Sequence, residues 1–316
     1  MVQKTTDASQ TAQIIIWFLF VVSVFSVGAG LGTKYALLRK LTWDDWLMFL
    51  ALAFSLAQCI TISLAASQGL GKDMSTLSGD SITSFLKAEY ASVPLQITTF
   101  ALVKWSIAVF IEHLSPNETH HRIDLGLRVV VGLWLVSGIF SSLFQCSIPT
   151  PWDYINGTCI NRRAWWTYIG VLNVVTELGI IVLYLLIIWN LQTSLSRKVI
   201  VLSIFLTRIL VIAGSIVQLV VFWNALPDSN VTQSMWLPVI LNQAVLCASI
   251  LTACLPYLKP FIESLQSGII RVENLPGSEE ELSRYRTGTS AYYSSALSNS
   301  AACSHPSNRS TDRSMN

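Results

Sequence analysis

The sequence predicts an all-α fold, a seven-transmembrane-helix bundle with the N-terminus outside the cell and the C-terminus in the cytoplasm. Hydrophobic residues make up 52% of its 316 residues and charged residues only 12%, against about a quarter in an average soluble domain. The mean hydropathy is +0.54, and seven long apolar stretches follow one another along the chain. So few charges could not coat a soluble multi-domain enzyme, and the net charge of +2 gives no electrostatic footprint for a nucleic-acid partner.

Each predicted span is long enough to cross the bilayer core, which needs roughly 20 mainly apolar residues. Leu, Ile, Val, Ala and Phe dominate the stretches, and the alternating pattern of an outer-membrane barrel is absent. Pro94 and Lys104 interrupt the third stretch. The predicted spans are residues 14–33, 45–67, 88–111, 125–144, 165–191, 199–223 and 235–258.

The first apolar run could be confused with a secretory signal, because only Lys4 precedes it. Its core, 14–32, is longer than the roughly 7–15 residues of a typical signal core, and no small-residue cleavage site follows it. We therefore expect a first helix that is retained.

The orientation follows from the Lys and Arg residues near the span ends, since these gather on the cytoplasmic side. Nine of them flank the first, third and fifth connections or follow the last span, and five lie on the other side. This bias predicts a short extracellular segment at 1–13, a membrane domain at 14–263 and a cytoplasmic tail at 264–316. The tail is rich in Ser and Thr and lacks hydrophobic periodicity, which is typical of a disordered segment.

Two glycosylation motifs fall in connections that this orientation places outside. They are Asn156-Gly-Thr and Asn230-Val-Thr, and we expect both asparagines to be glycosylated.

Cys146 and Cys159 both lie in the outward fourth connection. A disulfide between them would hold this loop over the mouth of the bundle. The alternative is two free thiols, which the oxidising side of the membrane disfavours.

Three charged residues stand out inside the predicted spans, namely Lys104, Glu177 and Arg208. Charges in a bilayer are costly and usually face the bundle interior. We expect Glu177 to pair with one of the two cations and so to tie the third, fifth and sixth spans together. The alternatives are a ligand site and, for Lys104, a side chain that extends toward the lipid headgroups.

Asp44 and Asp45 stand at the cytoplasmic start of the second span. Carboxylates favour helix N-termini, where backbone N–H groups are unpaired. These two residues are therefore predicted to cap the helix, and the alternative is contact with a cytoplasmic partner.

Several motifs together resemble one family, the seven-helix rhodopsin-domain integral membrane proteins of filamentous fungi. They are WDDW at 43–46, QGLGKD at 68–73, VKWS at 103–106, WNLQ at 189–192 and TACLPYLKPF at 252–261. The resemblance covers roughly residues 14–275 and implies a receptor-like protein. The chain departs from the family pattern at Glu177, where Asp is usual, and at Gln218, where Arg is frequent.

Retinal chemistry requires a Lys amine in the middle of the bundle, and in known opsins the last helix carries it. The seventh span contains no Lys. We therefore expect no retinal and no other cofactor. No His or Cys spacing indicates a metal site, since His113, His120 and His121 are expected to lie in a solvated loop.

These observations predict a receptor-like protein of the plasma membrane or another secretory-pathway membrane. It would sense an external or membrane-borne small molecule and contact a cytoplasmic signalling protein. One alternative is a membrane-embedded enzyme that acts on a lipophilic metabolite with Glu177 as the acid. The other is a transporter, for which paired broken helices and inverted repeats would be expected.

Overall fold

The structure is a computed structural model in which every regular element is a helix within the described part of the chain. That part comprises residues 2–40, 42–114, 118–155, 157–190, 195–226 and 230–273. The chain divides into a compact unit, Met1–Phe261, and a second unit, Ile262–Asn316, of which only the backbone of a helix end is described. The arrangement below concerns the first unit.

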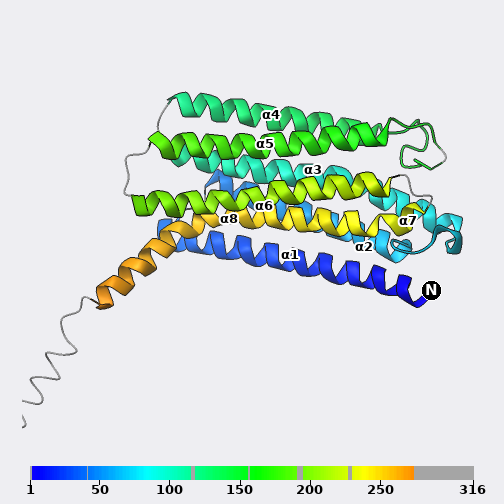
Figure 1. The fold of residues 1–316 in the computed structure, drawn as a ribbon, viewed down its shortest axis with the longest axis horizontal. Helices are drawn as coiled ribbons and strands as arrows, with labels where there is room; N and C mark the ends of the chain where they lie inside the picture. The colour runs from blue at the N-terminus through cyan, green and yellow to red at the C-terminus, as the bar shows by residue number, and fades with distance from the viewer. Residues whose placement is uncertain are drawn as a thin grey trace, which may run out of the picture. The chain divides into compact units, whose positions relative to one another are not determined.

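Seven helices are long and apolar enough to cross a membrane, which confirms the predicted all-α, seven-span class (Figure 1). A single turn of 3-10 helix, η1 (Met74–Thr76), and a short helix, α7 (Val231–Ser234), lie in connections. The long helices are α1 (Val2–Leu38), α2 (Trp43–Gln68), α3 (Gly79–Leu114), α4 (Glu118–Leu143), α5 (Arg162–Asn190), α6 (Leu195–Ala225) and α8 (Trp236–Glu273).

The helices exceed the predicted spans mainly at four places, the starts of α1, α3 and α4 and the end of α8. α1 begins at Val2, so the segment expected before the first span is helical, and α8 runs to Glu273, beyond the expected end of the membrane domain at 263. The division into segment, membrane domain and tail stays a prediction, and residues 274–316 lie outside the described part. α3 ends at Leu114 and α4 begins at Glu118, so His113, His120 and His121 all belong to helices and His120 is buried. The expected solvated loop was therefore wrong for all three.

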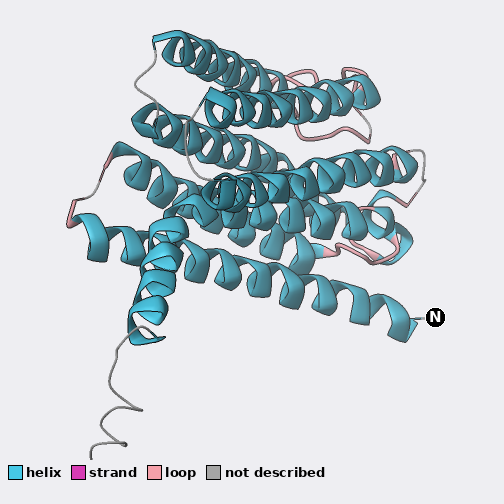
Figure 2. Ribbon diagram, turned by 60° about the vertical axis from the view of Figure 1, so that its left-hand side comes forward, coloured by secondary structure: helices cyan, strands magenta, loops and turns pink. Residues whose placement is uncertain are grey.

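α3 and α8 form the inside of the bundle. About two thirds of the most apolar windows of these helices are buried, 67% and 61%, against 22–39% for the other five. α3 contacts α2, α4 and α5 and continues through Pro94 without a break. A large hydrophobic cluster joins α3 with α2, α5 and α8 through residues such as Met48, Ile97, Ile180 and Leu246. Figure 2 shows the helices of the bundle from a second direction.

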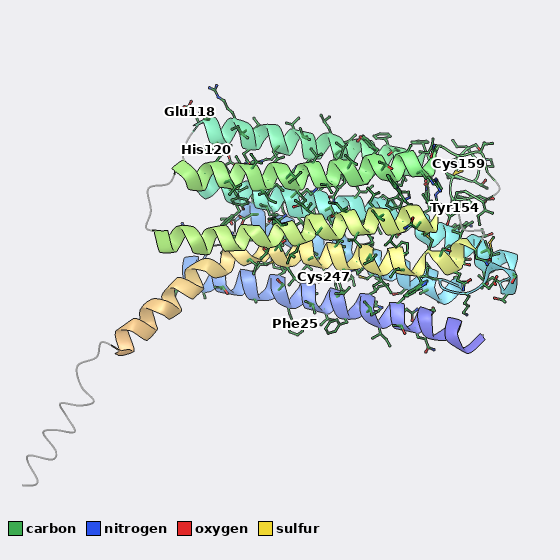
Figure 3. All side chains as sticks on the ribbon, viewed as in Figure 1. Phe25, Glu118, His120, Tyr154, Cys159 and Cys247 are labelled. Atoms are coloured by element: carbon green, nitrogen blue, oxygen red, sulfur yellow. A yellow bond between two sulfur atoms is a disulfide. The ribbon has the colours of Figure 1, made fainter. Side chains whose placement is uncertain are left out.

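Large apolar side chains cover the outside of the bundle. Phe18, Phe25, Leu133 and Phe140 are 61–72% exposed, and Phe25 points away from the bundle in Figure 3. A continuous apolar surface of this kind is unfavourable in water and favourable against acyl chains. The chain is therefore a multi-pass membrane protein, and its surroundings are a lipid bilayer.

The helix ends define two faces of the first unit. The N-terminal face carries the start of α1 and the connections α2–α3, α4–α5 and α6–α8, and the opposite face carries the ends of α1, α3 and α5 (Figure 1). On the N-terminal face α2 stops at Gly69, whose φ of 132° is a conformation that side chains disfavour. A Cβ there would come within 2.6 Å of Leu77, so glycine is required at this turn.

Candidate functional site

A cavity lies among α3, α4, α5 and α6 in the interior of the bundle. We call it the inner cavity, and it has about 470 Å³ of empty space, solvent-open parts included. Its lining is aromatic and aliphatic with a few amides and one hydroxyl, and it contains no ionisable residue. The lining residues are Gln96, Ile97, Phe100, Trp134, Trp166, Ile169, Gly170, Asn173, Ser215, Gln218, Leu219 and Phe222.

A second cavity, the outer cavity, adjoins the first and extends toward α2 and α8. It has about 420 Å³ of empty space and shares Gln96, Trp166, Gln218 and Phe222 with the inner cavity. Glu89 and Met235 line it as well. Glu89 precedes Gln96 on α3 and Met235 directly precedes α8, so both stand closer to the N-terminal face than Gln96 does. The two cavities therefore form one set of spaces that leads inward from that face.

Three amide side chains meet at the boundary of the two cavities. Asn242 Oδ1 on α8 accepts hydrogen bonds from Gln96 Nε2 on α3 and, at 2.8 Å, from Gln218 Nε2 on α6. This amide cluster joins three helices inside an apolar bundle. This cluster was not predicted from the sequence, although three amides in hydrophobic spans are a visible signal.

Lys104 on α3 lies directly behind the wall of the inner cavity. Its ammonium donates to Asn173 Oδ1 at 2.6 Å, to the Asn173 carbonyl at 3.0 Å and to the Thr176 hydroxyl at 2.6 Å. It also stands 4.9 Å from the centroid of the Trp134 ring. Asn173 and Trp134 therefore line the inner cavity and also contact the buried Lys104 ammonium. Lys104 does not extend toward the lipid headgroups, contrary to one of the alternatives.

Glu177 on α5 lies between the two intramembrane cations. Arg208 Nη1 on α6 donates to Glu177 Oε2 at 2.7 Å, and Lys104 Nζ is 3.7 Å from Glu177 Oε1. All three side chains are at most 1% exposed. The structure thus brings Lys104, Glu177 and Arg208 together as expected from their positions, but the carboxylate takes both cations instead of one.

The polar contacts continue toward the opposite face. Tyr184 is buried on α5 about two turns beyond Glu177, and Asp124 is buried on α4. Asp124 in turn pairs with Arg128 on α4. We call the series from the amide cluster through Asn173 and Lys104 to Arg128 the polar column.

At the opposite end of the column, Arg128 links α4 to α3. Its Nη2 donates to Glu112 Oε2 at 2.5 Å, and His121 Nδ1 is 3.2 Å from Glu112 Oε1. Glu112 and His121 are partly exposed, so the column reaches the surface on this face.

A separate buried cluster on the opposite face holds Asp44 and Asp45. Lys34, near the end of α1, lies 2.6 Å from Asp44 and 2.8 Å from Asp45. Asp45 Oδ2 also accepts from the Thr42 backbone N–H at 2.7 Å, as in a capping box. Ser106 on α3 donates to the Asp44 carbonyl at 3.0 Å, so this cluster joins α1, α2 and α3.

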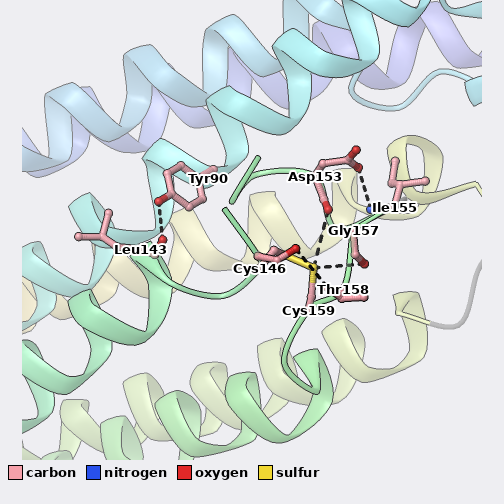
Figure 4. The surroundings of a disulfide bond; sticks show 9 residues. Tyr90, Leu143, Cys146, Asp153, Ile155, Gly157, Thr158 and Cys159 are labelled. Atoms are coloured by element: carbon pink, nitrogen blue, oxygen red, sulfur yellow. Dashed lines mark hydrogen bonds between the residues drawn. A yellow bond between two sulfur atoms is a disulfide. The ribbon is translucent and has the colours of Figure 1, made fainter. Parts of the chain in front are cut away.

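The connection from α4 to α5 is closed by a disulfide between Cys146 and Cys159, which confirms the predicted bond. Backbone hydrogen bonds on both sides, Ser147 to Thr158 and Ile160 to Gln145, hold the base of the loop. Figure 4 shows the bond between Cys146 and Cys159 beside Gly157 and Thr158. Of the predicted glycosylation residues, Asn156 in this loop lies outside the described residues. Asn230 precedes α7 on the N-terminal face.

A polar cluster under this loop lies next to the outer cavity. The Tyr154 hydroxyl donates to Glu89 Oε2 at 2.5 Å, Arg162 lies 3.4 Å from Glu89 Oε1, and the Arg162 guanidinium is 3.5 Å from the Tyr154 ring centroid. Burial and the Glu89 carboxylate raise the pKa of Tyr154 well above its usual value. The tyrosine therefore stays a hydrogen-bond donor and holds the loop to α3.

Three free cysteines are buried between helices of the bundle, namely Cys59 on α2 and Cys247 and Cys254 on α8. Gln243 on α8 donates to the Cys59 sulfur at 3.4 Å. Further along α8, Cys254 faces the backbone of Gly30 on α1. We describe them as packing residues of the α8 interfaces.

Comparison with known proteins places this architecture in a family. The model of the fungal rhodopsin domain matches residues 29–264. The chain is 27% identical over 180 residues to the polyenoic acids biosynthesis gene cluster protein Ba17b of Metarhizium anisopliae, which covers 53% of this chain and 48% of that protein. It is 28% identical over 210 residues to a SAT4 family membrane protein of Emericella nidulans, which covers 64% of this chain and 52% of that protein.

The chain thus spans about half the length of these curated relatives. No solved structure matches it. The family model, in contrast, covers most of the membrane bundle, including the cavities and the polar column. The chain therefore belongs to the fungal rhodopsin domain family.

Proposed function

We propose that this membrane protein is a receptor-like sensor of an external or membrane-borne small molecule. One observation carries the proposal: Asn173 and Trp134 line the inner cavity and are also direct partners of the buried Lys104. A molecule that displaces either side chain changes the surroundings of a charge that three helices share. Occupation of the cavity would thereby be transmitted to the packing of the bundle.

The proposed orientation places the N-terminal face outside and the opposite face in the cytoplasm. The excess of Lys and Arg near the opposite face supports it. The Cys146–Cys159 disulfide lies on the N-terminal face. In the plasma membrane or another secretory-pathway membrane, the side away from the cytoplasm is oxidising.

The orientation predicts that Asn230 carries a glycan. In a eukaryotic secretory membrane, wild type treated with an N-glycosidase will migrate faster on a gel. Asn230→Gln will lose the part of the shift that its glycan causes, whereas Asn117→Gln, in the sequon between the third and fourth spans of the sequence, will leave the shift unchanged. Loss of the shift in Asn117→Gln instead would reverse the orientation.

The ligand is proposed to enter beneath the disulfide-closed loop. The Tyr154–Glu89–Arg162 cluster borders the outer cavity, because Glu89 belongs to the lining of both that cavity and the smaller space under Tyr154. Displacement of this cluster would open a route from the loop to the amide cluster.

The signal would then pass along the polar column. A ligand shifts a conformational equilibrium only by the difference in its affinity for the two states. Glu177 pairs with both Lys104 and Arg208, and all three side chains are buried. A changed partner for Lys104 therefore alters the relative energies of different arrangements of α3, α5 and α6. The partly exposed Glu112 and His121, and the α2 start at Asp44 and Asp45, are the proposed regions of contact with a cytoplasmic signalling protein.

Retinal does not fit the residues present. The seventh candidate span, Val231–Pro256, which comprises α7 and the first part of α8, contains no Lys. Lys104 does not line the cavity, and its amine is engaged by Asn173, Thr176 and Glu177. We therefore derive no step through a Schiff base and propose that the ligand is bound without a covalent bond.

A second candidate function is a membrane-embedded enzyme of lipophilic metabolite synthesis. The name of the Metarhizium anisopliae relative, a protein of a biosynthesis gene cluster, favours it. The proposed acid, Glu177, is paired with two cations and does not line either cavity. The geometry therefore supports the sensor better; substrate turnover by purified protein, abolished in Glu177→Gln, would favour the enzyme.

The sensor proposal predicts that a change in the cavity wall is felt at the opposite face. Asn173→Leu, in protein reconstituted in lipid nanodiscs, will accelerate hydrogen exchange at the ends of α3 and α4 around Glu112 and Arg128 by about fivefold or more, because allosteric couplings are typically of this size. Asn224→Leu, the same change on the exposed side of α6, is the control. Unchanged exchange at the opposite face in folded Asn173→Leu would overturn the sensor proposal, because the cavity would then be uncoupled from that face.

A further inference from the structure

We infer that the cavities take an uncharged, flat and mainly apolar molecule carrying a group that both donates and accepts hydrogen bonds, such as a hydroxyl or a carboxamide. This inference rests on the proposed function and names the ligand class of the same site. Three features of the lining lead to it: the aromatic walls, the unmet hydrogen-bonding groups of the amide cluster, and the charges behind the walls.

The walls of the cavities are mainly aromatic. Phe100 and Trp134 line the inner cavity, and Trp166 and Phe222 line both cavities, with their ring centroids 4.4 Å apart. Aromatic faces favour flat apolar ligands, which stack on them or meet their edges.

The amide cluster has hydrogen-bonding groups to spare. Asn242 Oδ1 accepts both internal bonds. Among the described residues no partner is present for Gln96 Oε1, Gln218 Oε1 or Asn242 Nδ2, so two acceptors and one donor remain.

These atoms belong to side chains that line the cavities. Gln96 and Asn242 are only 7% and 8% exposed, and their unbonded atoms are not among the fully buried ones. Buried polar groups of native proteins normally have a partner. A ligand group that donates and accepts would satisfy them, whereas a purely apolar ligand would leave them unpaired.

The charges behind the walls disfavour ligands with a full charge. Two cations and one carboxylate, Lys104, Arg208 and Glu177, stand behind the inner cavity, so an ammonium group would meet an excess of positive charge. A carboxylate would lose its hydration without gaining a cation, because no Lys or Arg lines either cavity. Glu89 at the outer cavity is already paired with Arg162.

The experiment compares four probes that share one ring and differ in the attached group. They are 4-fluorobenzyl alcohol, 4-fluorobenzylamine, 4-fluorobenzoate and 4-fluorotoluene, titrated by ¹⁹F NMR into the full chain in nanodiscs. The variant Asn242→Leu removes the centre of the amide cluster. The matched control is Gln243→Leu, the same type of change one residue further along α8 at a buried amide that lines neither cavity. Gln218→Met serves as a second variant if the melting temperature shows that Asn242→Leu is not folded.

The expected result is saturable binding of the alcohol, about tenfold tighter than that of the other three probes, because loss of a buried hydrogen-bond partner typically costs that much. Asn242→Leu or Gln218→Met will lose this preference, and Gln243→Leu will keep it. Tighter binding of the amine or of the benzoate, or equal binding of fluorotoluene, would overturn the ligand class and leave the sensor proposal standing. If no probe binds in a saturable and Asn242-dependent way, the cavity is not a small-molecule site and both proposals fall.

Discussion

Glu177→Ala will strongly destabilise the solubilised protein, by about 3–5 kcal/mol, because removal of one partner of a buried ion pair leaves an uncompensated charge. Here two cations, Lys104 and Arg208, lose the carboxylate that both approach. The measurement is the melting temperature of the detergent-purified protein, together with the fraction that reaches the cell surface. No other single carboxylate substitution in the described residues is expected to affect α3, α5 and α6 together.

The chain offers a matched control for this experiment. Glu118 on α4 is 91% exposed and lies 3.9 Å from Arg122, so Glu118→Ala should change stability by less than about 1 kcal/mol. The double variant Glu177→Ala/Arg208→Met should recover part of the loss, since it removes the cation together with the anion. A Glu177→Ala protein with the melting temperature of the wild type would show that the pairing does not hold the helices together.

Lys34→Met is expected to have the second large effect. The Lys34 ammonium stands between Asp44 and Asp45, whose side chains are 1–2% exposed, so its loss leaves two buried carboxylates without their shared cation. The expected loss is again about 3–5 kcal/mol. It should appear as a lower melting temperature and as faster proteolysis at the connection between α1 and α2.

Lys40→Met, at an exposed position of the same connection, is the control and should behave like the wild type. Adding Asp44→Asn to Lys34→Met should restore some stability, because it removes one of the two uncompensated charges. If Asp44→Asn instead lowers stability further in that background, the Lys34 contact is not what stabilises the two carboxylates.

The arrangement of the spans was predictable because hydrocarbon imposes a simple rule: a spanning segment must be long, apolar and helical. Pro94 was expected to interrupt the third span, but α3 continues through it, as neighbouring helices allow for proline in membrane helices. The excess length of α1 and α8 was not predictable from hydropathy, because residues 2–13 and 259–273 are polar enough to lie outside a bilayer and still form helix.

The charged part of the site was visible in the sequence, since each intramembrane charge is costly enough to require a partner. Which atoms meet was not visible, because helix rotation and interhelical spacing decide whether Glu177 reaches one cation or two. Lys34 was interpreted only as a marker of orientation; its burial depends on the position of α2 relative to the last turn of α1. The amide cluster was missed because an isolated Gln or Asn in an apolar span carries no charge and has many possible partners.

The alkylation rates of the three buried thiols report on how often the helix interfaces that cover them open. Cys59 and Cys254 are covered by α8 packing against α2 and α1 respectively, so an alkylating reagent reaches them only when those interfaces separate. The alkylation rates of Cys59 and Cys254 therefore measure how often α8 separates from α2 and from α1. No residue has to be replaced to introduce a probe at either interface.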